Sequence, residues 1–452
     1  MKHFTPLLFI CLLVLVASCS EDFLAEKPDK RLVVPSTMED LQALNDYYEV
    51  HNANLPGMGE LSSDDYYILY DRWNALSSPY MKNGYIWAKE IWEGVISIDW
   101  NNRYQQVFYA NYVLEGLNEL DRSTDPEWYD QLKGTALFHR AHAFYQLAQL
   151  FCSPFDASSS NNGDGLPIRL SSDLNVTVGR STIRETYDRI VADLKKASAL
   201  LPERDSYKTR PVKAAACALL SRTFLVMQDY DNALVYADSA IGFNYELIDF
   251  NTLNTSASYP MEQYNSEVIF HSRMTRYTPL ASSRLIMDST LYESYAEEDI
   301  RKEAWFRAVS GNYTFKGSYD GSLQIFNGLA IDECYLTRAE CLARKGSVQE
   351  ALSTLNQLLI TRYSEGTFSP IDLTDQQQAL QTILLERRKE LLFRGIRWAD
   401  LRRLNLDPST AKTLYRNLNG TIYTLEPNSP NYTLPIADDV IQLSNLPQNI
   451  RQ

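Results

Sequence analysis

The chain has 452 residues, of which 45% are hydrophobic, and its 43 basic and 57 acidic residues give a net charge of −14. Non-specific binding of nucleic acid needs a basic surface that displaces counterions, so this balance argues against nucleic acid as a partner. The length allows a large core, and the 29 tyrosines and 7 tryptophans supply rings with a polar edge, which suit sugar surfaces as well as ordinary packing.

The N-terminus has the pattern of a lipoprotein signal peptide over residues 1–18. Lys2 precedes an apolar run over 4–16, which is shorter than the ~20 residues of a membrane-spanning helix. The sequence VASC at 16–19 resembles the bacterial lipobox, which implies cleavage before Cys19 and lipidation of its sulfur. Buried acyl chains would then hold the protein at a membrane, at ~0.8 kcal/mol per CH₂. The alternative is ordinary cleavage after a small residue, with Cys19 incidental.

Helical and irregular segments alternate along the rest of the chain. Apolar residues spaced three or four apart predict helices over 37–50, 104–120, 126–151, 181–201, 211–228, 332–344, 347–362, 375–394 and 396–404, with a further helix from Asp229. Asp125 before Pro126, and Thr182 with Glu185, are patterns typical of helix N-termini. Ser36 is the expected cap of the first helix.

Two of the later helices begin alike. DYDNAL at 229–234 and GSVQEAL at 346–352 both place a turn before Ala-Leu, in the manner of tetratricopeptide repeats, where a small Ala lets helices pack closely. We therefore predict a mainly α fold, a tetratricopeptide-like helical-repeat scaffold (an α–α superhelix) with large irregular loop insertions. The expected helical parts are about 36–50, 104–245 and 332–404, and the expected ligand-side loops are about 51–100 and 246–330. The tail after 404 contains several prolines and shows little periodicity.

Several segments, in their order along the chain, resemble the SusD/RagB family of surface glycan-binding lipoproteins. The stretch LERRKELLFRGIRWADLRR at 385–403 looks like the family's C-terminal helix signature. An acid usually stands where this chain has Arg394, and we expect this change to alter one surface pairing. The other matching segments are RAHAFYQLAQLF at 140–151, YAEEDIR at 295–301, RAE at 338–340 with GSVQEALSTL at 346–355, and LPI at 434–436 with LPQN at 446–449.

The resemblance implies a non-catalytic protein, with no cofactor, that captures oligosaccharide or polysaccharide at the cell surface. It implies attachment to the outer membrane through the lipid anchor, with the protein facing the exterior. It also implies a SusC-like TonB-dependent transporter as the partner that receives the ligand, and a single SusD-like domain over 19–452. Glu386, Arg397, Trp398 and Asp400 of the signature are expected to form a structural network.

Ligand residues in proteins of this kind lie on variable loops, where sugar binding combines aromatic platforms with polar partners. We predict tryptophan and tyrosine platforms in the first loop, polar partners beside them, and further contacts from both loops. The predicted set is Trp73, Tyr80, Trp87, Arg72, Asn83, Asp65, Tyr85 and Tyr277. By contrast, Trp92 and Trp100 precede a regular helix and are expected in the core.

Other sites are weakly indicated. His139 and His142 lie one helical turn apart but lack a third ligand, so no metal site is expected. The polar loop over 156–164 has oxygens for calcium but no EF-hand pattern, and a simple turn is expected. No catalytic motif such as G-x-S-x-G or H-E-x-x-H occurs. The four cysteines of the later chain form no C-x-x-C pair and are expected as buried thiols, although export would allow a disulfide: Cys152, Cys217, Cys334 and Cys341.

Two functions of other classes stay open at this point. A helical-repeat scaffold that binds peptide or protein would bury the loop aromatics and present an apolar groove on the repeats. A surface hydrolase would need convergent carboxylates or a nucleophile in a cleft. A glycan-binding protein would instead expose aromatic rings on the loops, with the choice of sugar set by loop geometry.

Overall fold

A computed structural model describes residues 35–452 of the chain. The predicted signal peptide over 1–18 and the predicted lipidation site Cys19 lie outside the described residues. Among those that are described, no helix combines the length and the apolar character needed to cross a membrane.

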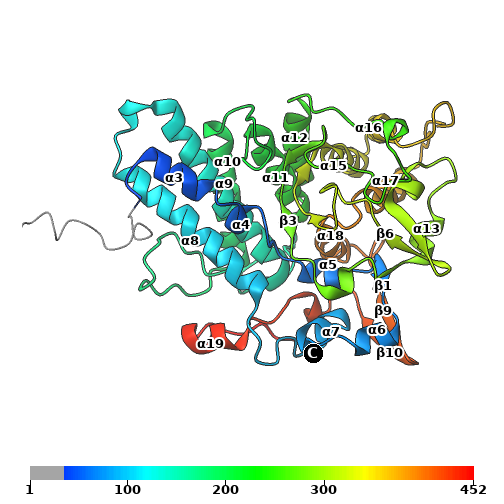
Figure 1. Cartoon of the computed structure of the whole chain (residues 1–452), viewed down its shortest axis with the longest axis horizontal. Coiled ribbons are helices and arrows are strands. Elements are labelled where there is room, and N and C mark those ends of the chain that lie inside the picture. The colour runs from blue at the N-terminus through cyan, green and yellow to red at the C-terminus, as the bar shows by residue number, and fades with distance from the viewer. Residues whose placement is uncertain (1–34) are drawn as a thin grey trace, which may run out of the picture.

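Long helices dominate the regular structure (Figure 1). They are α8 (Ile98–Asn118), α9 (Pro126–Phe151), α10 (Ile183–Leu200), α11 (Lys213–Val226), α12 (Tyr230–Ile241), α15 (Ile331–Arg344), α16 (Val348–Leu359) and α17 (Gln376–Glu390). The shorter helices are α3 (Met38–Asn45), α4 (Tyr48–His51), α5 (Met58–Ser62), α6 (Tyr70–Asn74), α7 (Pro79–Tyr85), α13 (Ser289–Glu293), α14 (Arg301–Trp305), α18 (Arg397–Leu404) and α19 (Asp438–Ser444). Single 3₁₀ turns lie at Arg122–Thr124, Phe250–Thr252, Thr278–Leu280 and Pro430–Tyr432.

The strands are short and form antiparallel pairs. The pairs are β1 (Tyr66–Tyr67) with β4 (Ile286–Met287), β2 (Val268–Phe270) with β8 (Leu329–Ala330), β3 (Arg273–Met274) with β7 (Ile325–Phe326), β5 (Phe306–Val309) with β6 (Asn312–Phe315), and β9 (Leu414–Leu418) with β10 (Thr421–Leu425). Three of these pairs join residues of the expected loop over 246–330, and one brings the first loop to that segment.

The predicted helix starts are set by side-chain caps. Asp125 accepts a hydrogen bond from the Trp128 N–H at the start of α9, and Thr182 and Glu185 form a reciprocal capping box at the start of α10. The first helix differs from the prediction, because Thr37 rather than Ser36 caps α3 and the helix ends at Asn45. Asp46, the next residue, leaves helical geometry and its carboxylate is bound by a distant arginine, so a tertiary contact interrupts the expected helix over 37–50.

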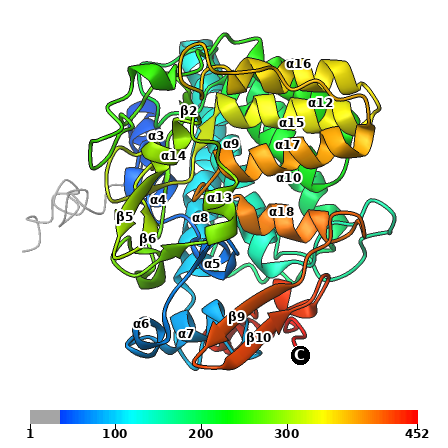
Figure 2. The same cartoon turned by 90° about the vertical axis from the view of Figure 1, so that its right-hand side faces the viewer.

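The long helices pack in sequence as an array of helical hairpins. α8 packs on α9, α9 on α10, α11 on α12, and α15 on both α16 and α17. Ala233 and Ala351, from the two repeat-like segments, are fully buried where α12 and α16 begin their close packing. The prediction of a mainly α, tetratricopeptide-like scaffold with irregular insertions is confirmed. Figure 2 shows α12, α15, α16 and α17 stacked together, with α6, α7, β9 and β10 at the opposite end of the molecule.

One large hydrophobic core joins the helices to the irregular segments. It runs along the chain from Leu55 to Leu446 and includes Trp92 and Trp100, as predicted. The four cysteines of the described chain are buried and unpaired. The first loop is therefore packed into the body of the molecule, and five short elements, α4 to α7 and β1, replace much of the loop expected over 51–100.

The tail forms an unpredicted β-hairpin. β9 and β10 pair from Leu414–Leu425 to Leu418–Thr421, which leaves a two-residue turn of Asn419 and Gly420. Both turn residues have positive φ, 53° and 86°, as a tight hairpin turn that matches the strand twist requires. The hairpin lies beside α6 and α7, so segments from the first and last quarters of the chain meet at one end of the molecule (Figures 1 and 2).

Candidate ligand-binding cleft

A cleft of about 530 Å³ opens between strand β1 and the β9–β10 hairpin. Its volume falls within the ~300–1,000 Å³ range of small-ligand sites. Residues from three distant parts of the chain line it: Asp64, Tyr66, Tyr67, Tyr85, Asp288, Lys412, Thr413, Leu414, Tyr415, Arg416 and Asn417.

Two tyrosines offer exposed surface at this cleft. Tyr67 on β1 is 36% exposed, and Tyr415 on β9 is 64% exposed. Side chains alternate along β9, so Tyr415 and Asn417 face solvent while their neighbours are buried. The faces of such rings suit the C–H surfaces of sugars, and Thr413 and Asn417 add uncharged hydrogen-bonding groups.

Arg416 fastens the hairpin to the N-terminal wall of the cleft. Its guanidinium donates to the carbonyl oxygen of Tyr66 at 2.7 Å and to that of Ser63. It also lies over the rings of Tyr85 and Trp87, 4.3 and 5.1 Å from their centroids. Carbonyl acceptors and aromatic faces together stabilise a buried guanidinium, so this one side chain fixes the spacing of the two walls.

The floor of the cleft is a group of ion pairs centred on Asp64. Its carboxylate accepts hydrogen bonds from Arg397 at 2.6 Å and from Lys412 at 2.8 Å, and Arg388 lies 3.4 Å away. Burial by itself would raise the pKa of Asp64, but Arg397 and Arg388 outweigh it and hold that pKa well below its usual range. Asp64 is therefore an ionised group that orients its neighbours rather than a proton donor.

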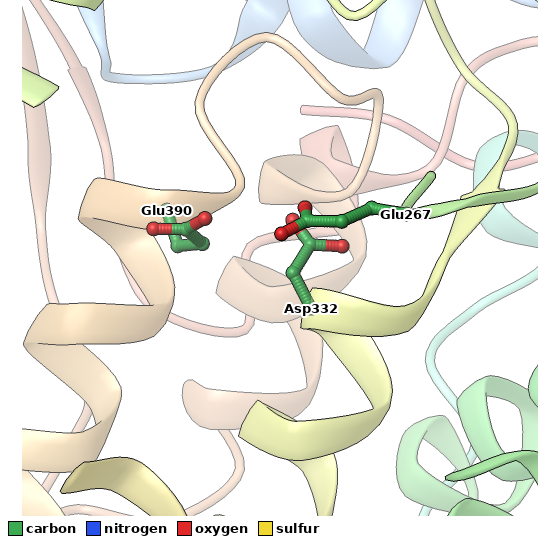
Figure 3. A group of neighbouring side chains, drawn as sticks. All are labelled: Glu267, Asp332 and Glu390. Carbon is green, nitrogen blue, oxygen red and sulfur yellow. The ribbon is translucent and has the colours of Figure 1, made fainter. Parts of the chain in front are cut away.

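A separate group of carboxylates lies in the core, where β2, α15 and α17 meet (Figure 3). Oxygens of Glu267, Asp332 and Glu390 lie within 4.8 Å of one another. Arginines are their partners: Arg362 contacts both glutamates, at 2.7 and 2.8 Å, and Arg394 contacts Asp332 at 3.0 Å. These guanidinium groups supply the positive charge that the cluster needs, so it forms a buried ion-pair network.

The histidines of α9 are equally enclosed. His139 Nε2 lies 3.2 Å from the Asn45 carbonyl oxygen, and its ring stacks on His51 with centroids 3.9 Å apart. His142 contacts the side chain of Gln146 at 3.2 Å. Burial lowers the pKa of His139 to about 3 and holds those of His51 and His142 well below the usual value. All three rings are neutral packing groups.

The polar loop over 156–164 is a turn held by its own side chains, as expected. Asp156 accepts a hydrogen bond from the Ser158 N–H at 2.8 Å, and Asn161 accepts one from the Asp156 N–H at 3.0 Å. Both contacts are typical of short loops in which Asp and Asn side chains bond to nearby backbone.

Comparison with known proteins identifies the family. A family model described as starch-binding and associating with the outer membrane matches residues 22–225, and the model of the SusD family matches residues 331–450. The chain belongs to the SusD/RagB family. Two curated SusD-like proteins of Formosa agariphila are 21% and 22% identical to it, over 69% and 68% of this chain and 72% of each relative.

Solved structures show the same fold. A SusD superfamily protein from Bacteroides thetaiotaomicron has a TM-score of 0.75 and 23% identity, and covers 92% of this chain and 100% of its own. A putative sugar binding protein from Bacteroides vulgatus has a TM-score of 0.73 and 22% identity, and covers 92% and 99%. At the level of the family, these similarities support carbohydrate binding and association with the outer membrane.

The SusD/RagB signature at 385–403 is structural in this chain. Glu386 pairs with Arg301 at 2.6 Å, Arg397 pairs with Asp64, and Trp398 is buried. Asp400 accepts hydrogen bonds from Arg387 and Arg403 at 2.9 and 2.8 Å. The signature therefore ties α17 and α18 to the first loop and to the start of α14, and Arg397 carries the network to the floor of the cleft.

Arg394 does not lie on the surface, so the expected change in a surface pairing is wrong. Its side chain is 3% exposed, pairs with Asp332, and lies over the rings of Tyr319 and Phe326, 4.5 and 4.8 Å from their centroids. Phe393 and Gly395 on either side have positive φ, which turns the chain sharply here and directs Arg394 into the core.

Four of the predicted ligand residues are buried in this structure, and their roles in binding stay predictions. Trp87, Tyr85, Tyr277 and Asp65 are each 3% exposed or less. The Trp87 indole donates to the Ser62 carbonyl at 2.9 Å, the Tyr277 hydroxyl donates to Asp99 at 2.8 Å, and Asp65 pairs with Arg388 at 2.8 Å. Tyr85 belongs to the cleft floor, but its ring is covered and its hydroxyl accepts from the Ile68 N–H. Of these rings, Tyr85 lines the cleft and Trp87 lies beneath Arg416.

The other four predicted residues are partly exposed but do not line the cleft. Trp73 donates to the Lys82 carbonyl at 3.2 Å, and Tyr80 packs against Trp92 and Tyr277. Arg72 donates to the Arg284 carbonyl at 2.8 Å, and Asn83 donates to Glu93 at 2.7 Å. Their roles in binding stay predictions, and most of their polar groups already have partners within the protein.

The second wall of the cleft was missed, because no ligand role was predicted for the tail. Asn419-Gly420 between two apolar runs is a hairpin signal, and it could have placed Tyr415 and Asn417 on one exposed face. In the folded protein this face lines the same cleft as Tyr67, which is 348 residues away along the chain. Nothing in a single sequence indicates that these two segments meet.

Two further grooves, of about 420 and 500 Å³, lie beside α3, α8 and the start of α9. Their linings mix apolar side chains with five acidic residues: Glu39, Asp121, Asp125, Glu115 and Glu119. They differ from the continuous apolar groove that a peptide-binding scaffold was expected to show. The peptide-binding scaffold was also expected to bury its aromatic side chains. Trp87 is buried, as that alternative predicts, whereas Tyr67 and Tyr415 are exposed.

Proposed function

We propose that this chain is a surface glycan-binding lipoprotein, a single domain over 19–452, that captures oligosaccharide in the cleft between β1 and the β9–β10 hairpin. It is held to the outer membrane by lipid on Cys19, faces the cell exterior, and delivers its ligand to a SusC-like TonB-dependent transporter. Family membership and the lipobox at 16–19 support the anchor and the partner.

The observation that carries the proposal is that Tyr67 and Tyr415, both exposed, line the same cleft. Two exposed rings on separate strands, with Thr413 and Asn417 beside them, offer the combination of apolar faces and hydrogen-bonding groups that sugars require. The two rings stand on separate strands that Arg416 holds together. The strands therefore need little ordering when the ligand binds.

We propose further that the protein has no catalytic activity of its own. Hydrolysis of a glycosidic bond generally needs one carboxylic acid that gives up a proton and a second carboxylate opposite it. Of the two carboxylates that line the cleft, Asp64 has its pKa held well below the usual range by Arg397 and Arg388, although burial alone would raise it. The remaining one, Asp288, is part of a helix cap.

The test is binding of the mature protein, purified in detergent, to a panel of plant, host and microbial polysaccharides by affinity electrophoresis. Tyr67→Ala and Tyr415→Ala are each expected to weaken retention at least tenfold, because each removes a ring face. Tyr207→Ala is the matched control, since Tyr207 is 60% exposed but does not line the cleft. Circular dichroism checks that every variant is folded.

Equal retention of the folded Tyr67→Ala, Tyr415→Ala and unmodified proteins would place sugar binding elsewhere, with Trp73 and Tyr80 as the next variants. Failure of every polysaccharide and of its oligosaccharides to bind would contradict the glycan-binding function itself.

A further inference from the structure

The charged groups around the cleft are almost fully compensated. On the floor, Asp64 and Asp65 are shared among Arg388, Arg397 and Lys412, with contacts of 2.6 to 3.7 Å. Three cations therefore face two carboxylates, and Asp288 supplies the third carboxylate. Arg416 directs its guanidinium inward to backbone carbonyls and aromatic rings, away from a ligand. Arg416 aside, the three other cations are matched by three carboxylates.

Asp288 differs from the other charged groups in having a free oxygen. It lies between β4 and α13, partly exposed, and its N–H donates to the Asp65 carbonyl at 2.9 Å. Its Oδ1 accepts a hydrogen bond from the Leu291 N–H at 2.8 Å, which caps α13. Within residues 35–452, no group donates to Oδ2, although Asp288 lines the cleft.

We infer that Asp288 makes the cleft select uncharged sugars and reject acidic ones. This inference rests on the proposed glycan-binding function and names its substrate class. The free Oδ2 can accept hydrogen bonds from sugar hydroxyls, and charge-assisted bonds of this kind are stronger than those between neutral groups. A uronate or sulfate at the same place would meet a like charge at short range, which opposes binding.

Lys412 does not reverse this preference. Its ammonium group is 2.8 Å from Asp64 Oδ2, and an acidic sugar would have to draw it away from that carboxylate. Anchoring an acidic group in proteins generally relies on an arginine whose fork is free to bind it. Arg388, Arg397 and Arg416 are already bound to aspartates or to backbone carbonyls of the protein.

The experiment compares pairs of ligands that differ only in charge. The mature protein in detergent is titrated calorimetrically with maltohexaose, cellohexaose, laminarihexaose and mannohexaose, and with each of them after oxidation of its C6 hydroxyls to carboxylates. For the hexaose that binds, we expect the neutral form to bind at least tenfold more tightly than its oxidised form. Raising NaCl from 20 to 300 mM should strengthen binding of the oxidised form, because salt screens the repulsion.

Asp288→Asn is the decisive variant, because Asn caps a helix as well as Asp and has the same shape. It should reduce the preference for the neutral form to about threefold or less and remove the salt effect, while the protein stays folded. Asp125→Asn is the matched control: it makes the same change at the N-cap of α9, away from the cleft, and should leave both affinities unchanged.

The outcomes separate the two proposals. Tighter binding of an oxidised hexaose than of its neutral form would overturn the selectivity and leave the glycan-binding function standing. An unchanged preference in Asp288→Asn would overturn the assignment to this residue. If Asp288→Asn behaves as expected but Tyr67→Ala and Tyr415→Ala bind normally, the selectivity holds and the assigned ring platforms are wrong. Lack of binding by every hexaose and polysaccharide would overturn the proposed function, and this inference with it.

Discussion

Arg394 shows how a single substitution within a family signature can be absorbed by the core. The resemblance puts an acid at this position, yet here a buried arginine pairs with Asp332 and lies over two aromatic rings. A buried pair is costly to break on one side, because the remaining charge is left without a partner.

Arg394→Glu is therefore expected to lower the free energy of unfolding by about 3–5 kcal/mol, since two carboxylates would then face each other in the core. Restoring opposite charges with Asp332→Arg in the same chain should recover part of the loss. Urea denaturation followed by circular dichroism measures both. Arg122→Glu breaks an exposed pair with Asp130 and should cost no more than about 1 kcal/mol. Equal losses in the buried and exposed variants would contradict this account.

At the same scale, burial separates the predicted ligand residues into two groups. The sequence does not distinguish Trp73 from Trp87, because their segment lacks helical periodicity. Such a segment gives no sign of which side chain faces the core. Trp87 adopts a positive φ of 59° and lies beneath Arg416, a residue from the tail. That contact depends on the folded topology, so the amino-acid sequence near Trp87 could not reveal it.

At the scale of elements, helices were well predicted and the hairpin was not. Period and capping are local signals, so α9 and α10 start at the capping residues expected for them. The break between α3 and α4 depends on Arg210, which binds Asp46 from 164 residues away. The β9–β10 hairpin did have a local signal in Asn419-Gly420, which the prolines of the surrounding tail obscured.

The turn of this hairpin gives a prediction about binding. Gly420 has φ of 86°, and Gly420→Ala should cost about 1–2 kcal/mol, because a side chain disfavours this conformation. Gly346→Ala, at φ of 85° between α15 and α16, is a matched control, and a Cβ meets no atom within 4 Å at either site. Both should lower the melting temperature by similar amounts. Only Gly420→Ala should weaken glycan binding, by a few-fold in calorimetry, since its strand carries Tyr415; equal affinities in the two variants would show that the hairpin is not part of the site.

At the scale of the whole molecule, two sets of buried groups have opposite effects on stability between pH 4.5 and 6.5. Burial lowers the pKa of His51, His139 and His142, so the unfolded chain takes up protons that the folded chain does not, and stability falls as the pH falls below about 6.5. Burial raises the pKa of Glu60 to about 8 and that of Glu267 to about 7, so their contribution is present at low pH and is lost as the pH rises through those values.

The free energy of unfolding should consequently fall by less between pH 6.5 and 4.5 than the three histidines alone would give, because the two acids offset part of their effect. Glu60→Gln removes one of the offsetting acids. In this variant stability should fall by about 2 kcal/mol more over the same window, and should exceed that of the unmodified protein at pH 9. Urea titrations at the three pH values measure this, and parallel pH profiles for the two proteins would refute it.

The fold class followed from repeating local patterns, whereas the cleft is a product of the complete topology. Its walls come from residues near 66 and near 415, and its selectivity is assigned to Asp288, far from both along the chain. One sequence shows which residue types are present in each segment. It does not show which segments meet.

Arg416 has a consequence for how the protein is made. The chain is synthesised from its N-terminus, so β1 and the rings of Tyr85 and Trp87 are made long before the hairpin that Arg416 holds against them. Until that arginine arrives, the carbonyls of Ser63 and Tyr66 lack this donor and the cleft has a single wall. The cleft is therefore complete only after the hairpin has been made, and a nascent chain that lacks the hairpin also lacks the proposed binding site.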